Sequence, residues 1–228
     1  FFPAGASGQF EDWLAGQSLA NYSNSPSSPN RAGNQVVTYI PIIQGCNNYC
    51  SYCIVPYRRG AEKSRLPADI LADAADSVTK GAREIILLGQ NVNAYGHDLE
   101  QDIDLCRLLR QLHDIPDLLR LRFLTNHPKD MSGNLIEAMA SLPKICRHVC
   151  LPLQAGDDRI LKAMNRHYTF DQYRSLIHEM RNKVPGVAIS TDLIVGFPGE
   201  TDGQFLNSLH ALEELRFDVV HAAMYSPR

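Results

Sequence analysis

The sequence predicts an α/β protein in which six β/α units form an incomplete barrel. Six short apolar runs are typical of strands, and helical patterns separate them. Strands that alternate with helices over about 30 or more residues per unit favour βαβ units and a parallel sheet. Each run is followed by a polar or glycine-rich segment, which is where a (β/α) barrel carries its active site. A doubly wound sheet would gather such segments at one switch point, so the partial barrel is favoured.

The predicted strands cover the chain from residue 36 onward. They are, in order, residues 36–43, 84–89, 119–125, 148–153, 187–196 and 219–225. The segments that follow them are QGCNNYC, GQNVNAYG, TNHPKD, LQAGDD, GFPGE and SPR. We therefore expect functional residues at the carboxyl end of every strand.

Two helices have clear boundaries in the sequence. Pro67 and Gly81 bracket a helix through residues 68–80, because proline suits the first helical turn and glycine suits the position after the last. Thr201 is expected to cap a last helix with one apolar face. The apolar positions on that face are Phe205, Leu209, Leu212 and Leu215.

The residues before the first strand have a different composition. Residues 21–35 are mostly Ser, Asn, Pro and Gly, which is typical of a flexible linker. Residues 1–20 are expected to be the remnant of a preceding domain or a tail. The core domain is therefore predicted to span residues 36–228.

Composition excludes several classes of protein. Of the 228 residues, 44% are hydrophobic and 21% are charged, which is typical of a globular chain and not of a collagen-like, coiled-coil or disordered one. No apolar run reaches the roughly 18 residues of a membrane span, and the first residues do not form a signal peptide. A net charge of −3 gives no general attraction to nucleic acid, so RNA binding would need a local basic patch.

Three cysteines crowd into eight residues of the first polar segment: Cys46, Cys50 and Cys53. A structural zinc site would need a fourth ligand, for which His97 and His127 are candidates. A [4Fe–4S] cluster usually takes four cysteines, so three would leave one iron open to a substrate or cofactor. Three free thiols in a polar loop would instead be exposed to oxidation.

The other three cysteines match no ligand spacing. We expect them to be buried or half-buried free thiols. They are Cys106, Cys146 and Cys150.

The run GCNNYCSYCIVPYRRGAEKSR (residues 45–65) resembles the cluster loop of the radical S-adenosylmethionine (SAM) methylthiotransferases. The string LLGQNVNAYG is similar to the MiaB-type branch, as are TNHPKD, LPLQAGDDRILKAMNRHYT and STDLIVGFPGET. The resemblance covers residues 36–228 and implies an incomplete (β/α)6 TIM-like barrel of the radical SAM type. It also implies that the three clustered cysteines ligate a [4Fe–4S] cluster, whose open iron binds SAM. An electron from the cluster then cleaves SAM into methionine and a 5′-deoxyadenosyl radical.

In that branch the substrate is an isopentenylated adenosine next to the anticodon of tRNA, and a methylthio group replaces the hydrogen at adenine C2. The resemblance therefore implies a cytoplasmic transferase that binds the anticodon stem-loop and an electron donor but no membrane, and we expect a monomer. It implies a second [4Fe–4S] cluster in an N-terminal domain and an RNA-binding C-terminal β-barrel, both expected outside this chain.

The resemblance also implies site residues at the strand ends, and it assigns no catalytic side chain. Those expected to bind the cofactor are Tyr52, Gly89, Gln90, Asn91, Gln154, Asp157 and Asp192. Asn93 and Tyr95 are expected to face the target nucleoside. Arg58 and Arg59 belong to a dense basic stretch just after the cysteines, which either contacts phosphates of the substrate RNA or is a solvated loop. Tyr52 packs either on the adenine of SAM or within its own loop. His127 is expected to be a core histidine whose nitrogens pair with the backbone.

Three alternative functions are weighed against this interpretation. Two are methylthiotransferases of other branches, one acting on a ribosomal protein and one on threonylcarbamoyl-adenosine in tRNA. The string GQNVNAYG argues against both. The third is a non-catalytic iron–sulfur or RNA-binding module, which would not need polar segments after all six strands.

Overall fold

The computed structural model describes residues 35–227, so the predicted linker and the segment before it lie outside the described residues except for residue 35. Six parallel strands form the wall of the fold, at the positions that the apolar runs predict. They are β1 (Val37–Pro41), β4 (Glu84–Leu88), β5 (Arg120–Phe123), β6 (His148–Cys150), β7 (Ala188–Val195) and β8 (Val219–Met224). Because all these pairs are parallel, their carboxyl ends meet at one edge of the wall.

The strands follow one another in space as they do in sequence. Two three-stranded sheets, β1-β4-β5 and β6-β7-β8, are joined by a parallel bridge between Leu121 and Ile145. The side-chain amide of Asn126 also donates to the carbonyl of Cys150 (3.0 Å). Within the described residues β1 and β8 do not pair, so the barrel is open, and the prediction of an incomplete six-unit barrel is confirmed.

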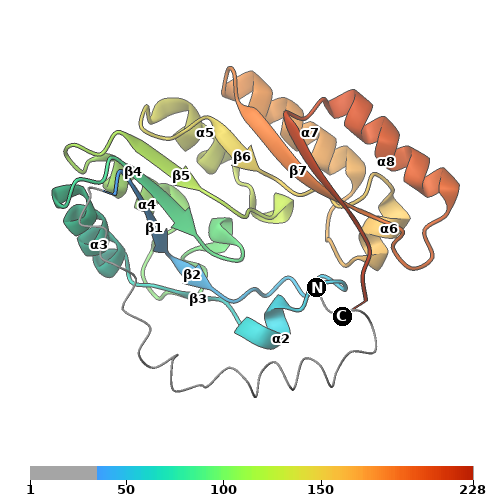
Figure 1. Ribbon diagram of the computed structural model, residues 1–228, viewed down its shortest axis with the longest axis horizontal. Coiled ribbons are helices and arrows are strands. Elements are labelled where there is room, and N and C mark those ends of the chain that lie inside the picture. Colours follow the sequence, from blue (N-terminus) through green and yellow to red (C-terminus); the bar gives the residue numbers. More distant parts are fainter. Residues whose placement is uncertain (1–34, 228) are drawn as a thin grey trace, which may run out of the picture. The chain divides into compact units, whose positions relative to one another are not determined.

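The helices are α2 (Val55–Arg59), α3 (Pro67–Thr79), α4 (Leu105–His113), α5 (Gly133–Ser141), α6 (Asp158–Ala163), α7 (Phe170–Lys183) and α8 (Asp202–Leu215). Short elements complete the fold: the antiparallel pair β2 (Ile43–Gln44) and β3 (Lys63–Ser64), and the 3₁₀ turns η2 (Val92–Ala94) and η3 (Pro128–Asp130). Helices α3, α5, α7 and α8 lie on the outer side of the strands, whereas α2 lies on the opposite side, below β2 and β3 in this view (Figure 1). Pro67 begins α3 and Thr201 caps α8 with a capping box, so both predicted helix starts are confirmed.

The buried face of α8 agrees in part with the predicted one. Leu215 is buried and Phe205 and Leu212 are half-buried, as expected, but Leu209 is 37% exposed, whereas Ser208 and Ala211 are buried. Small residues face inward because the backbone of Gly156 lies against the helix and its N–H donates to the Ser208 hydroxyl (2.8 Å). A Cβ at Gly156 would lie 2.6 Å from a backbone oxygen of α8, so close packing against Gly156 adds small residues to the apolar stripe of this face.

Replacement of Gly156 by alanine is expected to lower the free energy of unfolding by about 1–3 kcal/mol, because the new methyl group overpacks a backbone contact. Thermal unfolding measures the effect. Gly203→Ala is the matched control, since nothing lies within 4 Å of a Cβ at that position of α8. The control should be neutral or stabilising by up to about 1 kcal/mol. Equal stability of the two variants would contradict the packing argument.

Most of the apolar side chains between the strands and α3, α4, α5 and α7 form one buried cluster, and a smaller one lies under α6. In the part of the chain that the structure describes, no helix combines the length and the hydropathy needed to cross a membrane.

Candidate metal and cofactor site

The three clustered cysteines lie in the loop that follows β2, residues 45–53, which we call the cysteine loop. Cys50 is buried, Cys46 and Cys53 are half-buried, and all three are free thiols. Among the described residues, no three His, Cys, Asp or Glu side chains are grouped to hold a single metal ion. In a cubane cluster, by contrast, each cysteine binds its own iron.

The start of the cysteine loop is held by the backbone and by Gln90. Gly45 has a φ of +79°, and its N–H donates to the side-chain oxygen of Gln90 (2.7 Å). The next residue, Cys46, donates its N–H to the carbonyl of Gly60 (3.2 Å). A Cβ on Gly45 would collide with the carbonyl of Ala61, so only glycine fits here. Gln90, predicted to bind the cofactor, therefore positions the loop.

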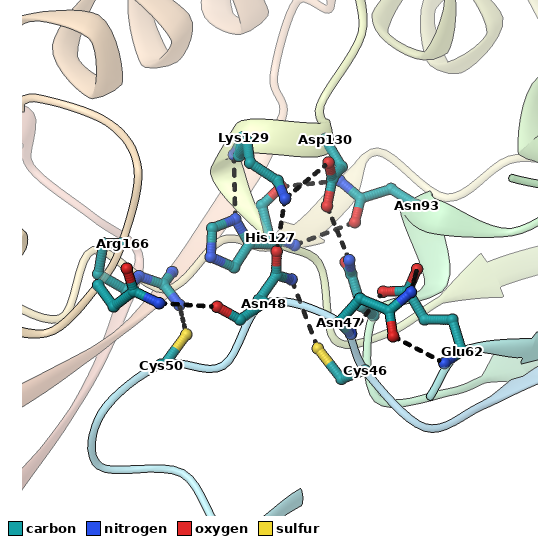
Figure 2. A network of polar contacts seen from close by, with 12 residues as sticks. Cys46, Asn47, Asn48, Cys50, Glu62, Asn93, His127, Lys129, Asp130 and Arg166 are labelled. Carbon is teal, nitrogen blue, oxygen red and sulfur yellow. Dashed lines mark hydrogen bonds and ion pairs between the residues drawn. The ribbon is translucent and has the colours of Figure 1, made fainter. Parts of the chain in front are cut away.

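A chain of polar contacts connects Cys46 to the ends of β4 and β5 (Figure 2). The amide of Asn48 donates to the sulfur of Cys46 (3.4 Å), and its oxygen accepts from the ammonium of Lys129 (2.6 Å). Lys129 also pairs with Asp130 (3.7 Å), which accepts from the amide of Asn91 (2.7 Å). One cysteine sulfur is thus fixed relative to two strand ends.

A buried arginine holds the other end of the loop. Arg166 is 4% exposed, and its guanidinium donates to the sulfur of Cys50 (3.5 Å) and to the hydroxyl of Tyr52 (3.2 Å). It also donates to the carbonyl of Pro152 (2.8 Å) and the hydroxyl of Tyr168 (2.9 Å). Sequence reasoning missed Arg166. The only signal was an arginine set between apolar and aromatic residues in the run LKAMNRHYT.

Several buried polar atoms near the strand ends have no partner among the described residues. They are Asn91 Oδ1, Asn126 Oδ1, His127 Nε2 and Gln154 Oε1. They follow β4, β5 and β6, and buried polar atoms normally have hydrogen-bond partners. A polar ligand with several donors, such as the amino group and ribose hydroxyls of SAM, would satisfy the three side-chain oxygens. These unpartnered polar atoms at the strand ends therefore fit such a cofactor.

Two more of the predicted cofactor residues, Asp157 and Gly89, also make contacts within the protein. Asp157 caps α6 and also accepts from Gln204 (3.0 Å) and Asn207 (2.9 Å) of α8. Burial raises the pKa of its carboxyl, but these hydrogen bonds outweigh burial and the pKa is lowered. A Cβ on Gly89 would collide with Ile43, so this glycine allows strand β2 to approach closely. Both residues thus have contacts within the protein, and their contact with a cofactor stays a prediction.

Asn93 and Tyr95 are buried and form hydrogen bonds within the protein. The ring of Tyr95 is fully buried, and its hydroxyl donates to the carbonyl of Arg65 (2.9 Å). The amide of Asn93 donates to the carbonyl of His127 (2.9 Å) and accepts from its N–H (3.0 Å). Both side chains therefore have partners within the fold, and their contact with the substrate stays a prediction.

Tyr52 and Asp192 keep partly open positions. Tyr52 packs against the smaller apolar cluster, which contains Met164 and Phe197, and burial raises the pKa of its hydroxyl. Asp192 lies half-buried on β7 opposite His221 of β8. Burial raises the pKa of the Asp192 carboxyl. Their contact with a cofactor stays a prediction.

Arg58 and Arg59 end helix α2, just after the cysteine loop, and both are exposed. Neither has an ion-pair partner among the residues that the structure describes. The remaining cysteines, Cys106, Cys146 and Cys150, are buried or half-buried free thiols, as predicted.

Comparison with known proteins gives three findings. Residues 40–212 match the family profile described as the Radical SAM superfamily. The chain is 54% identical over 189 residues to a protein of Dehalococcoides mccartyi named tRNA-2-methylthio-N(6)-dimethylallyladenosine synthase, covering 83% of this chain and 45% of the relative. A protein of the same name from Thermoanaerobacter sp. is 51% identical over 200 residues, covering 88% of this chain and 42% of the relative.

Among solved structures, the radical S-adenosylmethionine methyltransferase TsrM of Kitasatospora setae has a TM-score of 0.67 at 20% identity. The match covers 82% of this chain and 36% of the TsrM chain. The TsrM structure contains bound cobalamin and a [4Fe–4S] cluster. At this identity the likeness supports the fold alone. The chain spans less than half the length of the curated relatives named above.

Proposed function

Because this chain belongs to the radical SAM superfamily, we propose that it is the radical SAM core of an enzyme that adds a methylthio group to adenine C2 of an isopentenylated adenosine next to the anticodon of tRNA. The observation that carries the proposal is the 54% identity to a relative named for this product. The polar segments that follow all six strands favour a catalytic core over a non-catalytic binding module.

In this proposal Cys46, Cys50 and Cys53 hold a [4Fe–4S] cluster, and a second cluster lies in a domain outside this chain. SAM bound there would supply radical chemistry after one-electron reduction by the cluster. The residues that would hold SAM are Tyr52, Asn91, Gln154 and Asp192. Asn91 and Gln154 have buried oxygens without a partner among the described residues, and Tyr52 and Asp192 are half-buried.

The surrounding residues support the cysteines. Asn48 and Arg166 donate to the sulfurs of Cys46 and Cys50, and such hydrogen bonds orient ligands and stabilise their negative charge. Lys129 supports Asn48 through its ammonium group. The strand wall and the apolar cluster beside Tyr52 keep water away from the reacting groups.

The test of this proposal is release of 5′-deoxyadenosine from SAM by the protein, after anaerobic reconstitution with iron and sulfide and addition of a strong reductant. Product that depends on reductant and on iron is the expected result. Absence of product from protein that holds its full iron complement would contradict a catalytic core. Mass spectrometry of a prenylated anticodon stem-loop RNA, after reaction within a full-length relative carrying this core, then checks the methylthio group.

The exposed pair Arg58 and Arg59 is proposed to contact phosphates of the tRNA, since arginines position a nucleic acid without reading its sequence. The proposal includes an electron donor as a further partner and no contact with a membrane. It takes the protein to be a cytoplasmic monomer. The alternatives that act on a ribosomal protein or on threonylcarbamoyl-adenosine are not favoured, because both relatives are named for a dimethylallyladenosine product.

Replacement of Arg59 by alanine is expected to weaken binding of an anticodon stem-loop RNA and to reduce the slope of log affinity against log salt by about 1, because one phosphate contact is lost. Release of 5′-deoxyadenosine should not change. Binding at several salt concentrations measures both effects. Arg110→Ala, at an exposed position of the outer helix α4, is the matched control. An unchanged salt slope for Arg59→Ala would rule out the contact.

A further inference from the structure

His127 follows β5 at the carboxyl edge of the wall and is 5% exposed. The side-chain amide of Asn93 holds its backbone, since it donates to the carbonyl of His127 and accepts from the N–H of His127. Its ring lies edge-on to Tyr168, with ring centroids 5.8 Å apart. In Figure 2 the imidazole lies between Lys129 and Arg166, the two cations that support the cysteine loop. The ring is therefore held close to the proposed cluster and cofactor.

The hydrogen bonds of the ring define its tautomer. The Nδ1 atom accepts from the backbone N–H of Lys129 (3.2 Å), so Nδ1 carries no proton. In a neutral imidazole the proton then resides on Nε2. The Nε2 atom is buried and has no partner among the described residues. His127 thus carries a buried N–H donor that the protein itself does not use, which differs from the expected core histidine.

The ring is also kept uncharged. Burial, assisted by the positive charges of Arg166 and Lys129, lowers the pKa of His127 to about 2. The Nε2–H donor of His127 is therefore present at any physiological pH. The neutral ring also avoids repulsion with the positive charges of Arg166 and Lys129. A buried donor left unpaired costs about 1–3 kcal/mol, so its retention at a ligand site is best explained by a ligand acceptor.

We propose that the Nε2–H of His127 donates a hydrogen bond to an acceptor atom of a bound adenosine group. Both SAM and the target nucleoside contain adenosine, so the recognised chemistry is a ring nitrogen or a ribose oxygen in either case. The inference rests on the proposed function, since that function supplies both adenosine ligands. It adds His127 to the residues that touch the ligand, with Asn93 and Lys129 as its positioning residues.

Two substitutions separate a ligand role from a structural one. His127→Asn keeps an acceptor where Nδ1 accepts from Lys129 but removes the distant donor. His127→Gln reaches the position of Nε2 with an N–H but loses the acceptor near the backbone. A ligand role predicts that Asn weakens binding about 3- to 10-fold, the effect of one lost hydrogen bond, and that Gln retains more of the affinity. A structural role predicts the reverse order, together with a lower melting temperature for Gln.

The experiment measures binding of SAM to the reconstituted protein and of an anticodon stem-loop RNA with isopentenylated adenosine, for wild type and both variants. Weaker binding of SAM by His127→Asn identifies the cofactor as the acceptor, and weaker binding of the RNA identifies the target nucleoside. Affinities within twofold of wild type in both arms overturn the inference. Wild-type protein that binds neither ligand overturns the proposed function instead, and the inference falls with it.

A second readout does not depend on activity. The ¹⁵N resonances of labelled histidine report which ring nitrogen carries the proton. We expect His127 to remain the neutral Nε2–H tautomer from pH 8 to pH 5 and its Nε2 resonance to shift when the ligand binds. A charged ring or the Nδ1–H tautomer, observed in the protein without ligand, would contradict the inference.

Discussion

Replacement of Cys50 by alanine is expected to abolish release of 5′-deoxyadenosine and to reduce iron retention more than about 100-fold, since loss even of groups that only support a ligand costs 10- to 100-fold. Cys50 is the buried member of the three cysteines, and its sulfur accepts a hydrogen bond from Arg166. With two cysteines left, the cluster would lose its central attachment to the loop. Iron analysis after gel filtration and chromatography of the SAM products measure the two effects.

The matched control is Cys106→Ala. Cys106 is also buried, but it lies on α4, and burial raises the pKa of its thiol to about 11, so it stays protonated and unreactive. We expect normal iron and normal product from this variant. Iron retained at wild-type level by Cys50→Ala, or lost equally from the control, would contradict the assignment of the cysteine loop.

The second large effect is expected at Arg166. Replacement by methionine should lower the free energy of unfolding by about 2–4 kcal/mol, because the carbonyl of Pro152 and the hydroxyls of Tyr52 and Tyr168 lose a buried donor at the same time. The same variant should lose iron more readily, since the sulfur of Cys50 loses its hydrogen bond. Denaturant unfolding and iron retention over time measure these changes.

Two further variants sharpen this prediction. Arg166→Lys keeps the charge but not the planar set of donors, so it should recover only part of the stability. Arg159→Met changes an exposed arginine of α6 nearby and should stay within about 0.5 kcal/mol of wild type. If Arg166→Met unfolded at the same denaturant concentration as wild type, the guanidinium would not hold the loop to the barrel.

The fold was largely predictable because its signals are local. Apolar runs and the helix-start residues Pro67 and Thr201 act within a few residues of themselves, and the structure confirms the elements that they predict. The buried face of α8 was not predictable in the same way. Which residues of α8 face inward depends on its contact with the backbone of Gly156, which lies about 50 residues earlier in the chain. No pattern within the helix itself indicates that contact.

The sequence by itself determined the cysteine spacing, the family and the order of the six strands along the chain. Each of these features depends on residues that are close to one another in the sequence. Only the tertiary structure decided what the polar residues at the strand ends do. Arg166 contacts Cys50 across 116 positions and His127 pairs with Asn93 across 34. A side chain's role depends on which donors and acceptors remain free once such distant partners have met. That is why Asn93 and Tyr95 turned out to be occupied while the Nε2–H of His127 remains available.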